Sequence, residues 1–251
     1  MSKPKSKQPS LPPPPPLPSS GKQPRGPEAR ILRALGEHYI EETMERFPSV
    51  GSAMGRHEFD GELELPSEKL IRAQQKLVRS TLEQVEAISE NDLQGDDWLD
   101  RRALLAELRT ETWSHERETF RRNPESWVSS ALGSVHHLVV RNADDLTPVA
   151  EAIASRLARI PDYLEGAAEL LSRPVPLWRE TAQSSVTGAP SLFEAIREPL
   201  LATGKVKPRR LETLLENAGA AFKQYGKRVS RVAAGRPRDF SLGRERFEAL
   251  M

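Results

Sequence analysis

The chain has 251 residues, of which 37% are hydrophobic and 6% aromatic, so it can form one large domain or two small ones. It carries 37 basic residues, 36 acidic residues and no cysteine, which excludes disulfides, a thiol nucleophile and cysteine-ligated zinc. Five of the basic residues and none of the acidic ones lie in residues 1–27, so the remainder is slightly acidic. This distribution does not predict binding to nucleic acid.

The sequence predicts neither a membrane helix nor a secretory signal peptide. No run approaches the roughly 20 apolar residues that a membrane helix needs. The N-terminus begins with basic residues, but prolines follow where a secretory signal peptide needs an apolar helix. We therefore predict no membrane association and a cytoplasmic location.

Residues 1–27 form a basic, proline-rich tail of low complexity. Pro12–Pro18, interrupted only by Leu17, predicts a short polyproline II rod. One interpretation is a ligand for an aromatic-lined groove of the SH3 or WW kind. The other is a disordered, solubilising extension, because this composition cannot bury enough apolar surface to fold. Composition favours the second interpretation.

Three long helices are predicted after the tail. The first covers 27–47 and stops before the next proline, because the residue that precedes proline disfavours helical backbone angles. A loop rich in glycine follows over 49–66. Ser67 is a plausible N-cap for a second helix that ends near residue 89, and a third helix is expected over 96–122.

The second half of the chain contains the most regular apolar stripe. Asn123 should cap a helix that has proline in its first turn. The stripe follows at 152–171, with Arg156 and Arg159 expected to point away from it. Pro161 lies within this pattern and should bend or restart the helix, because proline removes a backbone donor.

Prolines and glycines are expected to divide the last third of the chain. A helix that begins near Leu177 should end at 188–190, before a short helix over 191–202. A long helix is predicted over 208–234, and 239–251 begins another amphipathic element. No stretch alternates with the period of a strand. We predict an all-α fold, in which 28–251 form a multi-helix array of amphipathic helices behind a disordered tail.

The sequence contains no complete metal-binding or catalytic motif. A zinc peptidase needs two histidines one helical turn apart, with a glutamate beside the first. His57 and His115 are each followed by glutamate, but Gly61 and Thr119 stand where the second histidine would be. The adjacent histidines at 136–137 point about 100° apart on a helix, which suits a shared metal poorly. We predict no catalytic, cofactor-binding or metal-binding residue in this chain.

Basic side chains concentrate between Lys205 and Arg238. They could form a helix face that binds anions such as peptide carboxylates or nucleic acid. The alternative is an ordinary solvated face, with late cations favoured by the helix C-terminus. We favour the solvated face, because no aromatic side chains interleave with the basic ones as stacking on bases would require.

Four short pieces in a fixed order resemble a known family. They are PSVGSAMGRHEFD at 48–60, Asn-Pro at 123–124, RLARIPDYL at 156–164 and SLGRERF at 241–247. Together they resemble the bacterial family catalogued as domain of unknown function 885, whose members look like helical zinc metallopeptidases. The resemblance covers about residues 29–251 and leaves out the tail.

The resemblance implies the N-terminal helical half of such a protein. In the family, the zinc ligands and catalytic glutamate lie in a later half that has no counterpart here, so zinc is implied for full-length members only. Residues 28–251 would then be a helical domain that is incomplete at its C-terminus and inactive alone. Its partner would be a separate catalytic half or a peptide substrate. The alternative is a stand-alone helical interaction module with a proline-rich tail.

Overall fold

The computed structural model describes residues 26–241, 243–244 and 247–248. Within these ranges every regular element is a helix, which confirms the all-α prediction. The proline-rich tail up to residue 25 and part of the expected terminal element lie outside the described residues. The α-helices are α1 (Pro27–Arg46), α2 (Pro48–Ala53), α3 (Glu68–Glu86), α4 (Asp96–Glu116), α5 (Thr119–Arg122), α6 (Pro124–Arg141), α7 (Ala150–Leu170), α8 (Pro176–Ala202) and α9 (Pro208–Arg231). Short 3-10 turns are η1 (His57–Phe59), η2 (Glu90–Asp92), η3 (Thr147–Val149) and η4 (Pro237–Phe240).

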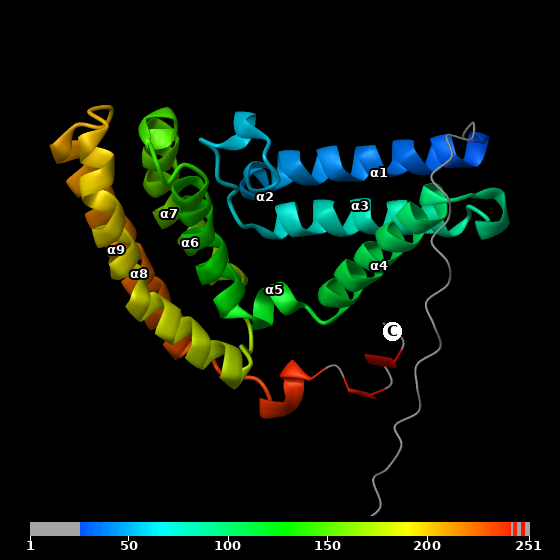
Figure 1. Cartoon of the computed structure of the whole chain (residues 1–251). Coiled ribbons are helices and arrows are strands. Elements are labelled where there is room, and N and C mark those ends of the chain that lie inside the picture. Colours follow the sequence, from blue (N-terminus) through cyan, green and yellow to red (C-terminus); the bar gives the residue numbers. More distant parts are fainter. Residues whose placement is uncertain (1–25, 242, 245–246, 249–251) are drawn as a thin grey trace, which may run out of the picture.

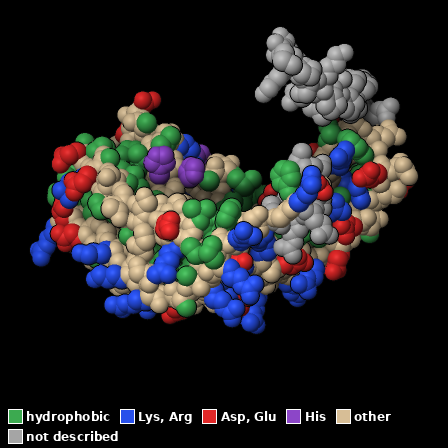
Figure 2. Space-filling model, turned by 90° about the horizontal axis from the view of Figure 1, so that it is seen from below, with side chains coloured by type: hydrophobic (Ala, Val, Ile, Leu, Met, Phe, Trp, Pro, Cys, Tyr) green, Lys and Arg blue, Asp and Glu red, His purple; other side chains and the backbone are tan. Residues whose placement is uncertain are grey.

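The helices form two lobes that diverge from a corner at α5 (Figure 1). In the N-terminal lobe, residues 27–116, α1 and α4 pack against α3 around a small apolar core. In the C-terminal lobe, residues 124–231, α6–α9 pack around a larger core, which Leu63 and Ile71 of the N-terminal lobe also join. The described chain therefore buries most of its apolar side chains in two clusters. Viewed from below, the surface is hollowed between the lobes (Figure 2).

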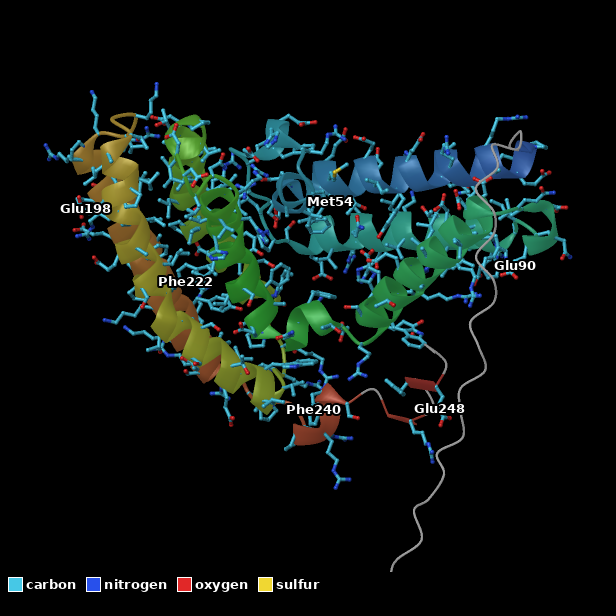
Figure 3. The ribbon with its side chains drawn as sticks, viewed as in Figure 1. Met54, Glu90, Glu198, Phe222, Phe240 and Glu248 are labelled. Carbon is cyan, nitrogen blue, oxygen red and sulfur yellow. The ribbon has the colours of Figure 1, made fainter. Side chains whose placement is uncertain are left out.

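Helix α9 shows how sequence spacing produces this packing. Leu211, Leu215, Ala218, Phe222 and Tyr225 recur every three or four residues, and all five are buried. That spacing places them on one face of the helix, which packs on α7 and α8. The ring of Phe222, which is labelled on α9 in Figure 3, lies beside the ring of Phe193 on α8, with ring centroids 5.9 Å apart. The apolar stripe of α9 therefore closes the C-terminal lobe.

Two predicted helix caps are confirmed. The hydroxyl of Ser67 accepts a hydrogen bond from the Leu70 amide at 3.2 Å, at the start of α3. The side-chain oxygen of Asn123 accepts from the amides of Glu125 and Ser126 at 3.1 and 3.4 Å, at the start of α6. Each cap satisfies backbone donors that the helix itself cannot pair.

Replacing Asn123 by alanine is expected to lower the free energy of unfolding by about 1 kcal/mol, because two amides at the start of α6 lose their acceptor. Chemical denaturation followed by circular dichroism measures the change. Asn217→Ala is the matched control, because Asn217 is exposed within α9 and alanine favours a helix interior. A loss of stability as large for Asn217→Ala as for Asn123→Ala would contradict the capping role.

Prolines inside the helices do not break them. Helix α7 continues through Pro161, so the expected interruption there is not observed. Helix α8 continues through both Pro190 and Pro199, so the prediction of two helices over 176–202 is wrong. Each proline removes one backbone hydrogen bond. The continuous apolar stripes on both sides of each proline are buried against neighbouring helices, and this burial outweighs the loss.

Three other boundaries differ from the prediction. The expected helix over 96–122 is split, because Glu118 adopts a left-handed conformation with φ of 49° between α4 and α5. No glycine or proline marks this position, so the sequence carries no signal for the corner between the lobes. The expected loop over 49–66 contains the short helix α2, which begins at Pro48 as proline in a first turn favours. Helix α9 ends at Arg231, three residues before its predicted end.

Candidate functional site

The segment of residues 48–64, which carries the first family-like piece, ties the two lobes together. We call it the linking segment. It follows α1 of the N-terminal lobe, and its hydrogen bonds run to α6 and α7 of the C-terminal lobe. Ser155 donates to the carbonyl of Gly61 at 2.7 Å, and Arg141 donates to the carbonyl of Ser52 at 2.7 Å. Hydrogen bonds from α6 and from α7 therefore fix the backbone of the linking segment.

Asp60 is the centre of this arrangement. Both of its carboxylate oxygens accept hydrogen bonds from Nη2 of Arg141 at 2.7 Å. The hydroxyl of Ser52 donates to Oδ1 at 2.6 Å, and Nδ1 of His57 lies 3.2 Å from Oδ2. Burial alone would raise the pKa of Asp60, but the hydrogen bonds from Ser52 and Arg141 outweigh it and leave the pKa below its usual value. Asp60 is therefore a charged carboxylate, and both of its oxygens accept hydrogen bonds within the fold.

Arg156 corrects a prediction from the sequence. It was expected to face away from the apolar stripe of α7, yet its side chain is fully buried. One guanidinium nitrogen donates to the carbonyl of Ser134, and Nη2 donates to the carbonyl of Phe59 at 3.1 Å. Burial lowers the pKa of Arg156, while the charges of Asp60 and Glu64 act in the opposite direction. Arg156 thus joins the linking segment to α6 and α7 at once, whereas Arg159 is exposed as predicted.

A groove with a volume of about 530 Å³ lies beside the linking segment, between α1, α2 and α4. We call it the α1–α4 groove. The sequence interpretation missed it, because its walls come from helices more than fifty residues apart. Met54 lies where α2 meets the end of α1, at one end of this groove (Figure 3). Its large apolar lining side chains are Leu32, Ile40, Met44, Val50, Met54 and Leu104.

Buried polar groups hold the wall of this groove. The hydroxyl of Tyr39 donates to Oε2 of Glu111 at 2.7 Å. The amide of Gln74 donates to Oε1 of Glu111 at 3.0 Å and to the hydroxyl of Thr43 at 3.1 Å. Burial and the charge of Glu111 raise the pKa of Tyr39 well above its usual value, so the phenol remains a neutral donor. These contacts fix α1 against α3 and α4 below the apolar lining.

The rim of the groove is acidic. Glu37 of α1 and Asp97, Asp100 and Glu107 of α4 line it, and Arg33 is the one basic side chain among the described lining residues. Asp97, Asp100, Leu104 and Glu107 follow one another at helical spacing and share one face of α4. The groove therefore offers apolar walls with a negative border.

The histidines do not form a metal site among the described residues. No group of three or more His, Cys, Asp or Glu side chains there could hold a metal ion. His57 approaches Asp60, but a cation at that pair would lie against the guanidinium of Arg141. His115 lies 3.8 Å from Glu111, whose oxygens already accept from Tyr39 and Gln74. The residues present at these two pairs therefore do not fit a zinc ion.

The basic side chains of 205–238 lie mainly on an exposed face, with most of them on or next to α9. Lys and Arg side chains also gather along one edge of the view in Figure 2. Arg197 and Arg210 pair with Glu212 and Glu151, at 3.3 and 2.8 Å. The exposure of these side chains agrees with the solvated face favoured from the sequence.

The fold and the groove define a class: a two-lobed array of α-helices with an apolar, acid-rimmed groove in its N-terminal lobe. A search of solved structures finds a similar fold in a protein described as a putative lipoprotein of unknown function from Shewanella oneidensis, with a TM-score of 0.66 and 17% identity. The match covers 79% of this chain and 37% of that protein. The family described as bacterial protein of unknown function (DUF885) matches residues 48–251, and the chain belongs to this family.

Two further findings bear on identity and location. The comparison with curated proteins found no match. None of the described helices combines the length and the apolar character that crossing a membrane would require. The cytoplasmic location stays a prediction.

Proposed function

We propose that this chain is a non-catalytic helical portion of a zinc-metallopeptidase-like protein, and that it forms one wall of a substrate groove completed by a second part. The main support is the structural match, in which most of this chain aligns with only 37% of the longer protein. The hollow between the lobes offers a surface against which a second part could pack (Figure 2). In this proposal the buried links of Asp60 and Arg156 hold the wall in shape.

A peptide-hydrolysis assay on the purified full chain tests this proposal. We expect no turnover above background with or without added zinc, and no stoichiometric zinc retained after dialysis. Chelator-sensitive turnover would overturn it. The genomic sequence that follows the codon for Met251 gives an independent test: a continuation that encodes paired histidines with a glutamate supports the proposal.

The alternative is a stand-alone interaction module, and the α1–α4 groove favours it. A groove of this size with apolar walls and a charged rim is typical of a binding site. Binding of a hydrophobic dye distinguishes the two functions. A broad apolar surface left open by a missing part would bind the dye strongly, whereas a complete module would melt cooperatively and bind little.

A further inference from the structure

Apolar side chains are exposed around the α1–α4 groove. Met54 is 61% exposed, Val50 42% and Ile40 40%, although each is large and hydrophobic. All three line the groove: Ile40 is in α1, Val50 is in α2, and Met54 directly follows α2. Clustered exposed apolar side chains with a polar rim mark sites at which another segment binds.

The acidic rim has charges that remain uncompensated. Among the described residues, Glu37, Asp100 and Glu107 form no ion pair, and all three are exposed. Among the lining residues that the structure describes, Arg33 is the only basic one. A segment that binds here should therefore combine apolar groups with positive charge.

We propose that the proline-rich tail of the same chain binds in this groove, with Leu11–Pro18 against the apolar walls and the basic residues of the tail at the acidic rim. The tail has the required chemistry, since residues 1–25 contain five basic side chains and no acid. The run of prolines with Leu11 and Leu17 supplies apolar surface at a low entropic cost, because a polyproline segment is already extended before it binds.

The tail is long enough to lie along the α1–α4 groove. From Leu11 to Pro18 the tail spans seven residue steps, roughly 22 Å in a polyproline conformation, which is close to the length of the groove. The groove runs along α1 from Ala29 to Met44, and Met44 lies about 26 Å from the start of α1 at 1.5 Å per residue. Ser-Ser-Gly at 19–21 has the composition of a turn that would let the tail fold back along α1.

Attachment to α1 favours the tail over a separate peptide. A covalently linked segment binds at an effective concentration that reaches the millimolar range for short flexible links. Weak apolar and ionic contacts are then sufficient for occupancy. Because the contacts with the rim are ionic and lie at the surface, binding should weaken as the salt concentration rises.

The chain permits a direct test by nuclear magnetic resonance. It has no cysteine, so Ser10→Cys creates a single site for a nitroxide spin label, directly before Leu11 and outside the segment proposed to bind. It has four methionines, and the two at positions 44 and 54 line the groove, so methyl-labelled methionine reports on its walls. In the full-length chain we expect the Met54 methyl signal to lose most of its intensity with the active label and to recover it after the label is reduced.

The control uses an exposed position on the other lobe. Leu177 of α8 is 49% exposed, and Leu177→Met adds a reporter far from the groove. Its signal should keep its intensity. An unchanged Met54 signal would overturn the proposal, and so would equal loss at both reporters. A mixture of isotope-labelled chains and separate spin-labelled chains tests binding between copies. If the Met54 signal is lost only in this mixture, the tail of a second copy binds the groove, and the proposal is overturned.

Charge reversal tests the role of the rim. The double variant Asp100→Lys with Glu107→Lys should restore most of the Met54 signal, as should high salt. The matched control is Glu165→Lys with Glu169→Lys, which makes the same change of charge at exposed positions of α7. Circular dichroism verifies that each variant folds. A signal that is unaffected by both the rim variant and salt would show that the rim does not hold the tail.

Discussion

Replacing Arg141 by methionine is expected to lower the free energy of unfolding by about 3 kcal/mol, because removal of one partner leaves a buried charge without its counter-ion. The guanidinium of Arg141 contacts both oxygens of Asp60 and the carbonyl of Ser52. Methionine keeps much of the volume but none of the donors. Urea denaturation followed by circular dichroism measures the loss.

Arg210→Met is the matched control for this substitution. Arg210 pairs with Glu151 at 2.8 Å, but the two side chains are 48% and 57% exposed. A surface pair of this kind contributes at most about 1 kcal/mol, because solvent screens it. If the two variants lost equal stability, the link between Asp60 and Arg141 would not stabilise the fold as a buried pair.

The same link predicts how stability depends on pH. The pKa of Asp60 is lower in the folded chain than in the unfolded chain, where it is near 3.8. The charged carboxylate therefore stabilises the fold above that pKa, and this contribution is lost as pH falls through the folded pKa. In Arg141→Met the pKa of Asp60 in the folded chain should rise toward its value in the unfolded chain. The free energy of unfolding should then fall less as the pH is lowered. Unfolding free energies of both proteins between about pH 5 and pH 2 provide the measurement.

Replacing Gly166 by alanine is expected to lower the free energy of unfolding by about 1–3 kcal/mol, although alanine normally favours a helix. Gly166 lies within α7, where a Cβ would stand 2.3 Å from the carbonyl oxygen of Pro66. That oxygen belongs to the backbone just before α3, so relief of the clash must move either the helix or the chain. Thermal unfolding followed by circular dichroism measures the effect.

Gly219→Ala provides the opposite expectation at a similar position. Gly219 also lies within a helix, α9, but a Cβ there would meet no atom within 4 Å. Alanine should raise the free energy of unfolding by about 0.5–1 kcal/mol at this position. Stabilisation by Gly166→Ala as well would show that α7 and the segment before α3 do not pack as closely as the structure indicates.

Local signals predicted many helix ends correctly. Ser67 and Asn123 cap their helices as expected, because a cap needs only its own side chain and the next two or three amides. Apolar spacing likewise predicted the buried faces of α7 and α9. The prolines within α8 misled the prediction, because the cost of one lost hydrogen bond is local whereas the burial that offsets it involves the whole helix.

The candidate site was much harder to predict from the sequence. The quoted piece at 48–60 pointed to the linking segment, but nothing in it indicated that Asp60 would meet Arg141 of α6. Arg156 was placed on the solvent side, because a charged residue between apolar ones normally faces water. Its burial depends on the carbonyls of Ser134 and Phe59, which come from other elements.

By itself, the sequence determined the all-α class, the faces that the main helices bury and a family-like order of short pieces, because these depend on spacing along one stretch of chain. The tertiary structure alone decided that the chain turns at Glu118, that Arg156 is buried, and that α1, α2 and α4 enclose a groove with an acidic rim. Those features depend on contacts between residues far apart in the sequence. Only packing brings such residues together.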